Sequence, residues 1–288
     1  MGYQLWVSPL TGYRRKGTRM GDLRNLFETG ITVNSIQEPL KSCFYKDSAL
    51  KVQAELKRLD FDIAGIRSSE DQPIRKFIRT TSLQSGNCEE IAECIKADDI
   101  IAESTPLTEV LSGLKDRTYF FILNGRQISG IITRADLQKP PVRILIFGMI
   151  SLLEMHLTFL VRTYFPDEKW HRVLKGKRKE DAESLLEKRK KRNEAIDLTD
   201  CLQFADKRDL VLASKEMQDH FGLEETKAKT KSVLNRIEKI RNNLAHSQDI
   251  VSGTTWEKLI EDVQKVERML QRSDEIVERD AHNKAINP

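Results

Sequence analysis

The feature that most constrains the fold is a helix, strand, strand pattern that occurs twice in the N-terminal half of this 288-residue chain. Residues 50–59 and 107–114 have the short apolar periodicity of a helix, and each is followed by an apolar strand, at residues 61–66 and 119–123. A second strand follows each first one, and the equivalent residues Leu83 and Leu137 lie 54 positions apart. Self-similarity at a fixed period predicts two structurally equivalent copies of one module.

The repeat resembles a tandem pair of CBS domains, the regulatory modules named after cystathionine β-synthase, over residues 29–138. The resemblance is most specific in the second copy, where Gly-Ile-Ile-Thr-Arg-Ala-Asp-Leu at residues 130–137 is similar to the closing motif of that family. It implies small mixed sheets flanked by helices. It also implies a regulatory ligand, which in this family is an adenine nucleotide.

The closing motif of the second copy has chemistry that suits a nucleotide. A strand ends at Ile132 and a helix begins there, so free backbone amides beside Thr133 could donate hydrogen bonds to an anion. Asp136 offers two oxygens for ribose hydroxyls. The CBS resemblance implies that the matching Thr and Asp contact the phosphate and the ribose. The alternative is that Thr133 and Asp136 form a capping box that only stabilises the helix.

The first copy departs from this motif, because Arg79 stands where the second copy has Thr133 and Ser82 stands where it has Asp136. This difference predicts that the first copy has no ribose clamp. We expect Arg79 instead to neutralise the charge of a phosphate bound next to the first copy. The sequence therefore favours one nucleotide or one multi-phosphate ligand per chain.

A second motif, Arg241-Asn242-Asn243-Leu244-Ala245-His246, lies in the C-terminal half. An arginine can stabilise charge on a phosphoryl group, and a histidine exchanges protons near neutral pH. The spacing resembles the Arg, four residues, His signature of HEPN domains, many of which cut RNA without a metal. It implies that His246 is a general base or acid, that Arg241 stabilises the transition state, and that Asn242 holds substrate or orients His246. The alternative is that Arg241 pairs with a carboxylate and His246 caps a helix.

The helix that leads into this motif can be read directly from the sequence. No Gly or Pro interrupts residues 224–245, and the apolar residues recur at three- and four-residue steps, namely Val233, Leu234, Ile237, Ile240 and Leu244. At about 100° per residue, Arg241 and His246 differ by roughly 140° around the helix axis. Either the helix ends near Ala245 or a second copy of the chain completes the site. Together with the strongly apolar helix that begins at Val142, this separation predicts a homodimer.

Residues 142–165 are long and apolar enough to cross a bilayer, but they carry charge at Arg143, Glu154 and Arg162. A buried helix is the expected outcome, with no membrane span. It resembles the first helix of a HEPN bundle, which implies that Glu154 faces Arg241 and His246. The alternative is an ion pair between Glu154 and another basic residue. Lys139-Pro140-Pro141 precedes this helix and marks the predicted domain boundary.

Charge and cysteine usage add two expectations. The net charge of +4 equals the contribution of Arg14, Arg15, Lys16 and Arg19, which predicts a basic N-terminal arm. Residues 169–193 hold eleven Lys or Arg against four acids, which fits either a solvated helix face or a surface for the RNA backbone. The four cysteines form no CxxC pair and have no His at ligand spacing, so reduced thiols, no metal site and a cytoplasmic protein are expected.

Together these features predict an α+β chain with a basic arm at residues 1–28, a tandem CBS pair at 29–138, an all-α HEPN-like bundle at 142–280, and a tail at 281–288. The four long helices of the bundle are expected at residues 142–165, 198–214, 224–245 and 256–277. The predicted function is a nucleotide-regulated endoribonuclease that needs no catalytic cofactor and acts on RNA. The HEPN resemblance implies a role in anti-phage defence or as a toxin. One alternative is a non-catalytic HEPN bundle that dimerises or binds RNA under the control of an adenine nucleotide bound to the CBS pair. Another is an energy sensor that tunes a metabolic partner.

Overall fold

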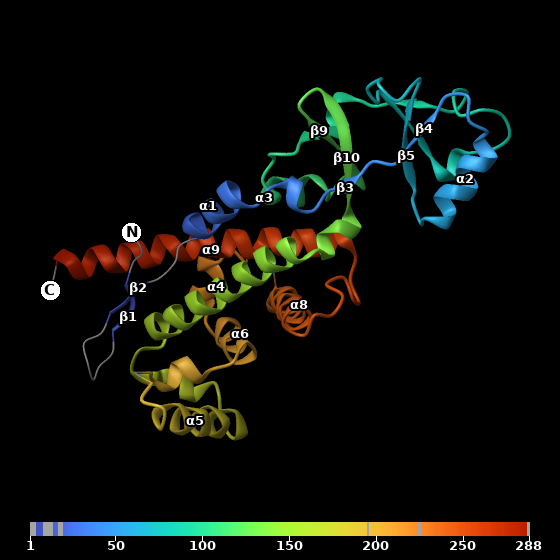
Figure 1. Cartoon of the computed structure of the whole chain (residues 1–288). Helices are drawn as coiled ribbons and strands as arrows, with labels where there is room; N and C mark the ends of the chain where they lie inside the picture. The colour runs from blue at the N-terminus through green and yellow to red at the C-terminus, as the bar shows by residue number, and fades with distance from the viewer. Residues whose placement is uncertain (1–3, 8–13, 17–19, 195, 224–225, 287–288) are drawn as a thin grey trace. The chain divides into compact units, whose positions relative to one another are not determined.

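The computed structural model describes the backbone of residues 4–7, 14–16, 20–194, 196–223 and 226–286 (Figure 1). The chain divides into two compact units, here called the repeat unit and the helical unit. The repeat unit is Phe27–Pro141, and the helical unit combines Met1–Leu26 with Val142–Pro288. Small mixed sheets in the first unit and long helices in the second confirm the α+β class.

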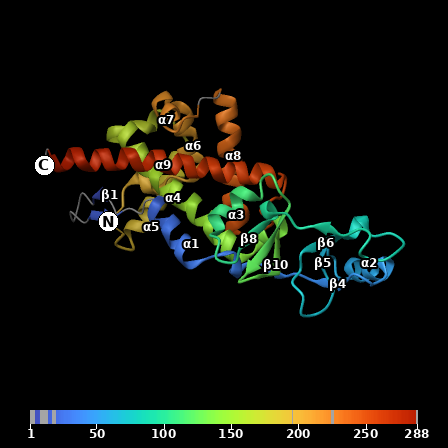
Figure 2. The same ribbon diagram turned by 90° about the horizontal axis from the view of Figure 1, so that it is seen from above.

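The repeat unit contains two copies of one βαββ module (Figures 1 and 2). The first copy consists of β4 (Ser42–Phe44), α2 (Ala49–Arg58), β5 (Ile63–Arg67) and β6 (Lys76–Arg79). The second consists of β8 (Ile100–Ala102), α3 (Leu107–Gly113), β9 (Tyr119–Asn124) and β10 (Gln127–Thr133). In each copy the first two strands are parallel, the helix is the crossover between them, and the third strand is antiparallel. The predicted repeat is confirmed, and the leading strand of each copy is an addition to it.

Each sheet is completed by a short strand that precedes the other copy. β3 (Glu38–Pro39) lies just before the first copy but pairs antiparallel with β10 of the second. β7 (Glu93–Cys94) lies just before the second copy but pairs antiparallel with β6 of the first. The strand orders are therefore β4-β5-β6-β7 and β3-β10-β9-β8. This exchange ties the two copies together through backbone hydrogen bonds.

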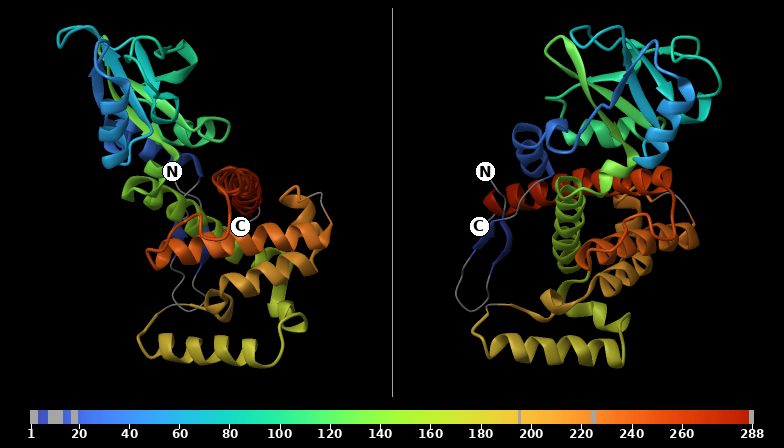
Figure 3. Two further views of the ribbon diagram at one scale, coloured as in Figure 1. Left: turned by 90° about the vertical axis from the view of Figure 1, so that its right-hand side faces the viewer. Right: turned by 45° about the vertical axis from the view of Figure 1, so that its right-hand side comes forward.

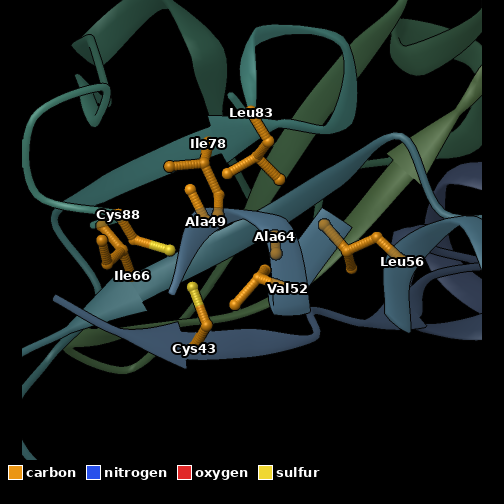
Figure 4. Close-up of a cluster of buried hydrophobic side chains, with 9 residues drawn as sticks. All are labelled: Cys43, Ala49, Val52, Leu56, Ala64, Ile66, Ile78, Leu83 and Cys88. Carbon is orange, nitrogen blue, oxygen red and sulfur yellow. The ribbon is translucent and has the colours of Figure 1, made fainter. Parts of the chain in front are cut away.

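Among the described residues, two apolar clusters contribute to the core of the repeat unit. The first lies within the first copy, where α2 packs on its sheet, and consists of Cys43, Ala49, Val52, Leu56, Ala64, Ile66, Ile78, Leu83 and Cys88 (Figure 4). The second joins the two sheets, with Leu40, Ile74 and Phe77 on one side and Phe121 and Ile128 on the other. The rings of Phe77 and Phe121 lie 5.1 Å apart at a tilted angle, a favourable aromatic arrangement. The burial of these side chains holds the two copies as one body.

The helical unit is built around long helices (Figure 3). Its main elements are α4 (Pro140–Tyr164), α5 (Lys177–Lys190), α6 (Phe204–Ala213), α7 (Lys215–His220), α8 (Lys227–Ala245) and α9 (Trp256–Ile286). The shorter elements are β1 (Gln4–Val7), β2 (Arg14–Lys16), α1 (Met20–Gly30), η5 (Pro166–Arg172) and η6 (Leu198–Cys201). Of the basic residues predicted to form the N-terminal arm, the side chains of Arg14, Arg15 and Lys16 and the whole of Arg19 lie outside the described residues.

The apolar helix predicted from residue 142 is α4, which begins at Pro140. Prolines fit the first turn of a helix because the amide they lack has no partner there. Among the described residues α4 alone is long and apolar enough to cross a membrane, yet 67% of its most apolar window is buried inside the protein. The prediction of a buried helix is confirmed.

Two predicted helix boundaries differ from the structure. The single helix expected over residues 198–214 is wrong, because η6 ends at Cys201 and α6 begins only at Phe204. Two capping boxes start these elements separately, one between Asp197 and Asp200 and one between Gln203 and Asp206. The last helix, α9, continues to Ile286 and so enters the residues predicted to be a tail.

Candidate functional sites

The end of α8 places the Arg and His of the C-terminal motif. α8 ends at Ala245 in a Schellman motif, in which the Gln248 amide donates to the Asn243 carbonyl at 2.8 Å and the Ser247 amide donates to the Leu244 carbonyl at 3.2 Å. Ser247 takes the left-handed φ of 54° that this motif requires. The predicted end of the helix near Ala245 is confirmed.

Two further residues hold this turn in place. The buried Asn243 side chain donates to the Asp249 carbonyl at 3.0 Å, and Arg143 of α4 donates to the carbonyls of Gln248 at 2.9 Å and Asn243 at 3.3 Å. A cation at the C-terminal end of a helix also interacts favourably with the helix dipole. The turn that carries His246 is therefore anchored to α4.

Arg241 lies one turn before the end of α8, beside Glu154 of α4. Arg241 Nη2 is 3.5 Å from Glu154 Oε2, and Arg241 Nη1 donates to Asn242 Oδ1 at 3.2 Å. The Arg241 side chain is 38% exposed and that of Glu154 is 21% exposed. The structure brings together three of the predicted catalytic residues, Arg241, Asn242 and Glu154.

His246 stands apart from this cluster. It follows the last residue of α8 as the C-cap, with φ −101° and ψ 14°, and its side chain is exposed. Within the described part of the chain, no hydrogen bond or ion pair joins its imidazole to Arg241, Asn242 or Glu154. A single chain does not assemble the Arg and His into one site, so the geometry matches the alternative of a paired arginine and a helix-capping histidine.

Lys207 of α6 is a member of the cluster that sequence reasoning missed. Lys207 is only 4% exposed, and its Nζ lies 3.6 Å from Glu154 Oε1. Burial lowers the pKa of Lys207, and the attraction of Glu154 opposes this shift. Because Lys207 lies 53 positions from Glu154, no local spacing in the sequence points to this contact.

In the closing motif of the second repeat copy, the side chain of Asp136 binds Thr133 of the same motif. Asp136 Oδ2 accepts from the Thr133 amide at 2.7 Å and from Thr133 Oγ1 at 3.0 Å, which forms a capping box at the start of η4 (Arg134–Gln138). Asp136 is only 7% exposed, and its Oδ1 pairs with Lys139 Nζ at 2.8 Å. Both carboxylate oxygens already have partners, so the alternative of helix stabilisation describes this arrangement.

Lys139 is a second residue that the sequence analysis did not connect to a site. Besides Asp136, its ammonium group contacts Glu38 of β3 and donates to the Ile36 carbonyl. Burial lowers the pKa of Lys139, but its hydrogen bonds to Asp136 and Glu38 outweigh that effect, and the pKa is raised. The spacing of three residues between Asp136 and Lys139 is the sequence feature from which this ion pair could be predicted.

Arg79 closes the first copy at the end of β6. Its guanidinium group donates to Tyr119 Oη at 2.8 Å and to Glu93 Oε1 at 3.1 Å, and it lies 5.1 Å from the ring centres of Phe77 and Tyr119. Tyr119 is in turn the β-sheet register partner of Thr133. Arg79 and Thr133, from different copies, therefore flank the same tyrosine, although Glu93 already balances the charge of Arg79.

Among the described residues, no group of three or more His, Cys, Asp or Glu side chains lies close enough together to hold a metal ion.

Solved structures that are similar to this chain match over its N-terminal region. No protein-family model matches the chain, and no curated protein matches it either. Solved structures that match over its N-terminal region are CBS domain pairs. A CBS-domain protein of Bacillus anthracis is 11% identical, with a TM-score of 0.34, and the match covers 39% of this chain and 93% of that one.

Two further structures give the same result. The acetoin utilization protein of Vibrio cholerae is 12% identical, with a TM-score of 0.36, and the match covers 41% of this chain and 95% of that one. The CBS domain of a bacterial CNNM/CorC-family Mg²⁺ transporter, solved in complex with ATP, is 12% identical, with a TM-score of 0.35 and coverage of 43% and 94%. Likeness at this level carries no argument about ligands. The HEPN resemblance of the helical unit stays a prediction.

Proposed function

We propose that this chain is a cytoplasmic, metal-independent endoribonuclease of HEPN type that acts as a homodimer and is controlled by an adenine nucleotide at the repeat unit. The observation that supports it best is the end of α8. Arg241 is oriented by Glu154 yet 38% exposed, and the His246 imidazole is exposed on an anchored turn. An oriented cation and an accessible imidazole are the groups that cleavage through the RNA 2′-hydroxyl requires.

In the proposed reaction, the 2′-hydroxyl oxygen attacks the adjacent phosphorus while His246 takes its proton. Arg241 stabilises the negative charge of the pentacoordinate transition state. The bond from phosphorus to the 5′-oxygen breaks, and a proton is returned to that oxygen. The products are a 2′,3′-cyclic phosphate and a 5′-hydroxyl. Asn242 is exposed beside Arg241 and would contact the substrate or orient His246.

A homodimer would bring His246 of one chain to Arg241 of the other. Its support is an apolar strip on α4, the helix that carries Glu154. Ile144 is 60% exposed, Phe147 is 39% exposed and Met155 is 49% exposed. Their spacing of three and eight residues keeps them on one side of the helix. Large exposed apolar side chains that share one helix face are typical of an interface.

The nucleotide part of the proposal rests on Thr133, Asp136 and Arg79. Arg79 and Thr133 flank Tyr119, so a phosphate near them would meet a cation and an aromatic ring. We propose that the ribose hydroxyls compete with Lys139 and Thr133 for the buried carboxylate of Asp136 and displace one of these contacts. Binding would then loosen the segment just before α4, which is how a ligand would influence the helical unit.

The second candidate is a non-catalytic protein that dimerises or binds RNA. The pairing of Arg241 with Glu154 and the absence of a contact to His246 in one chain favour this alternative. The two candidates are separated by incubating the purified protein with a mixed RNA pool in EDTA, with and without a panel of adenine nucleotides. Cleavage products that end in a cyclic phosphate support the ribonuclease, whereas RNA retention without cleavage supports the binding protein.

A further inference from the structure

Lys207 is a buried lysine, and moving an ammonium group from water into the protein interior is unfavourable unless partners compensate for the lost hydration. Lys207 is 4% exposed, and α6, which carries it, runs beside α8 in the helical unit (Figure 3). An apolar side chain of similar volume would usually pack at least as well at such a position. The partners of Lys207 therefore indicate what its charge does.

Among the described residues, both contacts of the Lys207 ammonium group are to Glu154. Nζ lies 3.6 Å from the carboxylate oxygen Oε1 and 3.5 Å from the main-chain carbonyl oxygen of the same residue. The Thr158 hydroxyl also donates to that carbonyl, at 3.0 Å. Two contacts to one residue fix the direction of its side chain as well as its position.

The carboxylate of Glu154 is shared between two cations in a definite order. Oε1 faces the buried Lys207, and Oε2 faces the half-exposed Arg241 at 3.5 Å. Arg241 in turn reaches Asn242, which is exposed. The contacts run from a fixed, buried cation through Glu154 to a cation at the surface.

We infer that Lys207 is a positioning residue for Arg241, which it holds in place through Glu154. Lys207 fixes Oε1, so that Oε2 points toward α8 and restrains the Arg241 guanidinium beside the end of that helix. Its catalytic consequence rests on the proposed ribonuclease function, but the positioning itself does not.

The positioning can be measured without RNA. Phenylglyoxal modifies exposed guanidinium groups, and peptide mapping by mass spectrometry gives the rate at Arg241 in the full-length protein. In Lys207→Met, we expect this rate to rise by about 2- to 10-fold, which is the lower part of the range for loss of one coupled contact. Glu154→Gln should raise it at least as much, because it removes the carboxylate that Arg241 contacts directly.

Lys258→Met is the matched control, because Lys258 pairs on α9 with Glu261, at 2.8 Å, and not with Glu154 or Arg241. Its Arg241 rate should equal that of the wild-type protein. If Lys207→Met does not fold, Lys207→Gln carries the same test, since the shorter uncharged side chain also removes the ion pair. A wild-type rate in the folded Lys207 variant, or in Glu154→Gln, would overturn the inference.

RNA cleavage gives a second readout that separates positioning from folding. Lys207→Met should lower kcat and leave KM near the wild-type value, because the substrate still meets Arg241 but in a less restrained geometry. A proportional rise in KM with kcat unchanged would contradict a positioning role. If the wild-type protein cuts no RNA while the Arg241 modification rate still rises, the proposed function fails and the positioning role stands.

Discussion

Two turns of this molecule use polar side chains to opposite effect. The closed turn, at residues 133–139, follows β10, and the open turn, at residues 246–248, follows α8. At the end of the second repeat copy, Thr133, Asp136 and Lys139 satisfy one another, and Asp136 is almost fully buried. At the end of α8, the turn is satisfied by backbone and by Arg143, while His246 is exposed on its outer side. A polar residue whose partners all lie in its own chain stabilises the fold. A polar residue on a rigid turn without such partners is available to a substrate.

The largest expected effect is on the open turn. His246→Ala should lower RNA cleavage at least about 100-fold, the usual contribution of general acid–base catalysis, with little change in unfolding free energy because the side chain is exposed. Cleavage rates in EDTA and urea unfolding measure the two quantities. Gln248→Ala, on the same turn, is the control and should keep activity, since only the backbone of Gln248 is used in the cap. A folded His246→Ala protein with normal cleavage would end the catalytic assignment.

The closed turn should respond in the reverse way. Asp136→Ala removes the acceptor of the capping box and leaves Lys139 with one carboxylate fewer, so we expect a loss of about 1–3 kcal/mol in unfolding free energy. Asp136→Asn keeps an oxygen for the cap and should lose less. Urea unfolding checks both variants. Unchanged stability of Asp136→Ala would mean that the carboxylate is held for another purpose.

Asp136 also tests the ligand. If an adenine nucleotide binds there, calorimetry should detect it with the wild-type protein, and Asp136→Ala should bind it more weakly and lose the nucleotide dependence of RNA cleavage. The unliganded cleavage rate should stay near that of the wild type. A nucleotide that binds both proteins equally would show that Asp136 serves only the fold.

Mixing variants sharpens the contrast between one chain and two. If His246 and Arg241 act across a two-fold axis, an Arg241→Ala chain and a His246→Ala chain form a mixed dimer with one intact site. After subunit exchange at equal amounts, activity should recover to about a quarter of the wild-type value, because about half of the dimers are mixed and each has one of two sites. A mixture that shows no cleavage activity would contradict a shared site. A strictly monomeric protein by sedimentation would contradict it as well.

The smallest expected effect is a pH dependence at the closed turn. The pKa of Lys139 is raised above its usual value of 10.5 by Asp136 and Glu38, so its contribution to stability is complete below that pH and is lost as the pH rises through the folded-state pKa. Above pH 10.5, unfolding free energy should fall more steeply for the wild type than for Lys139→Met. Equal slopes would show that the ammonium group adds nothing.

Local periodicity allowed much of this fold to be predicted. The two modules, the buried α4 and the end of α8 all depend on apolar spacing or on residues close in sequence. The contacts of Glu154 with Lys207 and of Arg79 with Tyr119 join residues 53 and 40 positions apart, and no local pattern encodes them. The break before Phe204 is set by the capping box of Gln203 and Asp206, which the apolar spacing of this segment does not reveal. The capping box at Thr133 was foreseen, because its residues are only three apart.

The exchange of β3 and β7 has a consequence for synthesis on the ribosome. The sheet of the first copy is complete once residue 94 has emerged, since β4, β5, β6 and β7 follow one another in the chain. β3 must wait for β10, whose residues 130 and 131 are its partners. At roughly 5–20 residues per second, that delay is on the order of 5–20 s. The residues around β3 therefore leave the ribosome early and wait unpaired, where a chaperone or a non-native strand can reach them first.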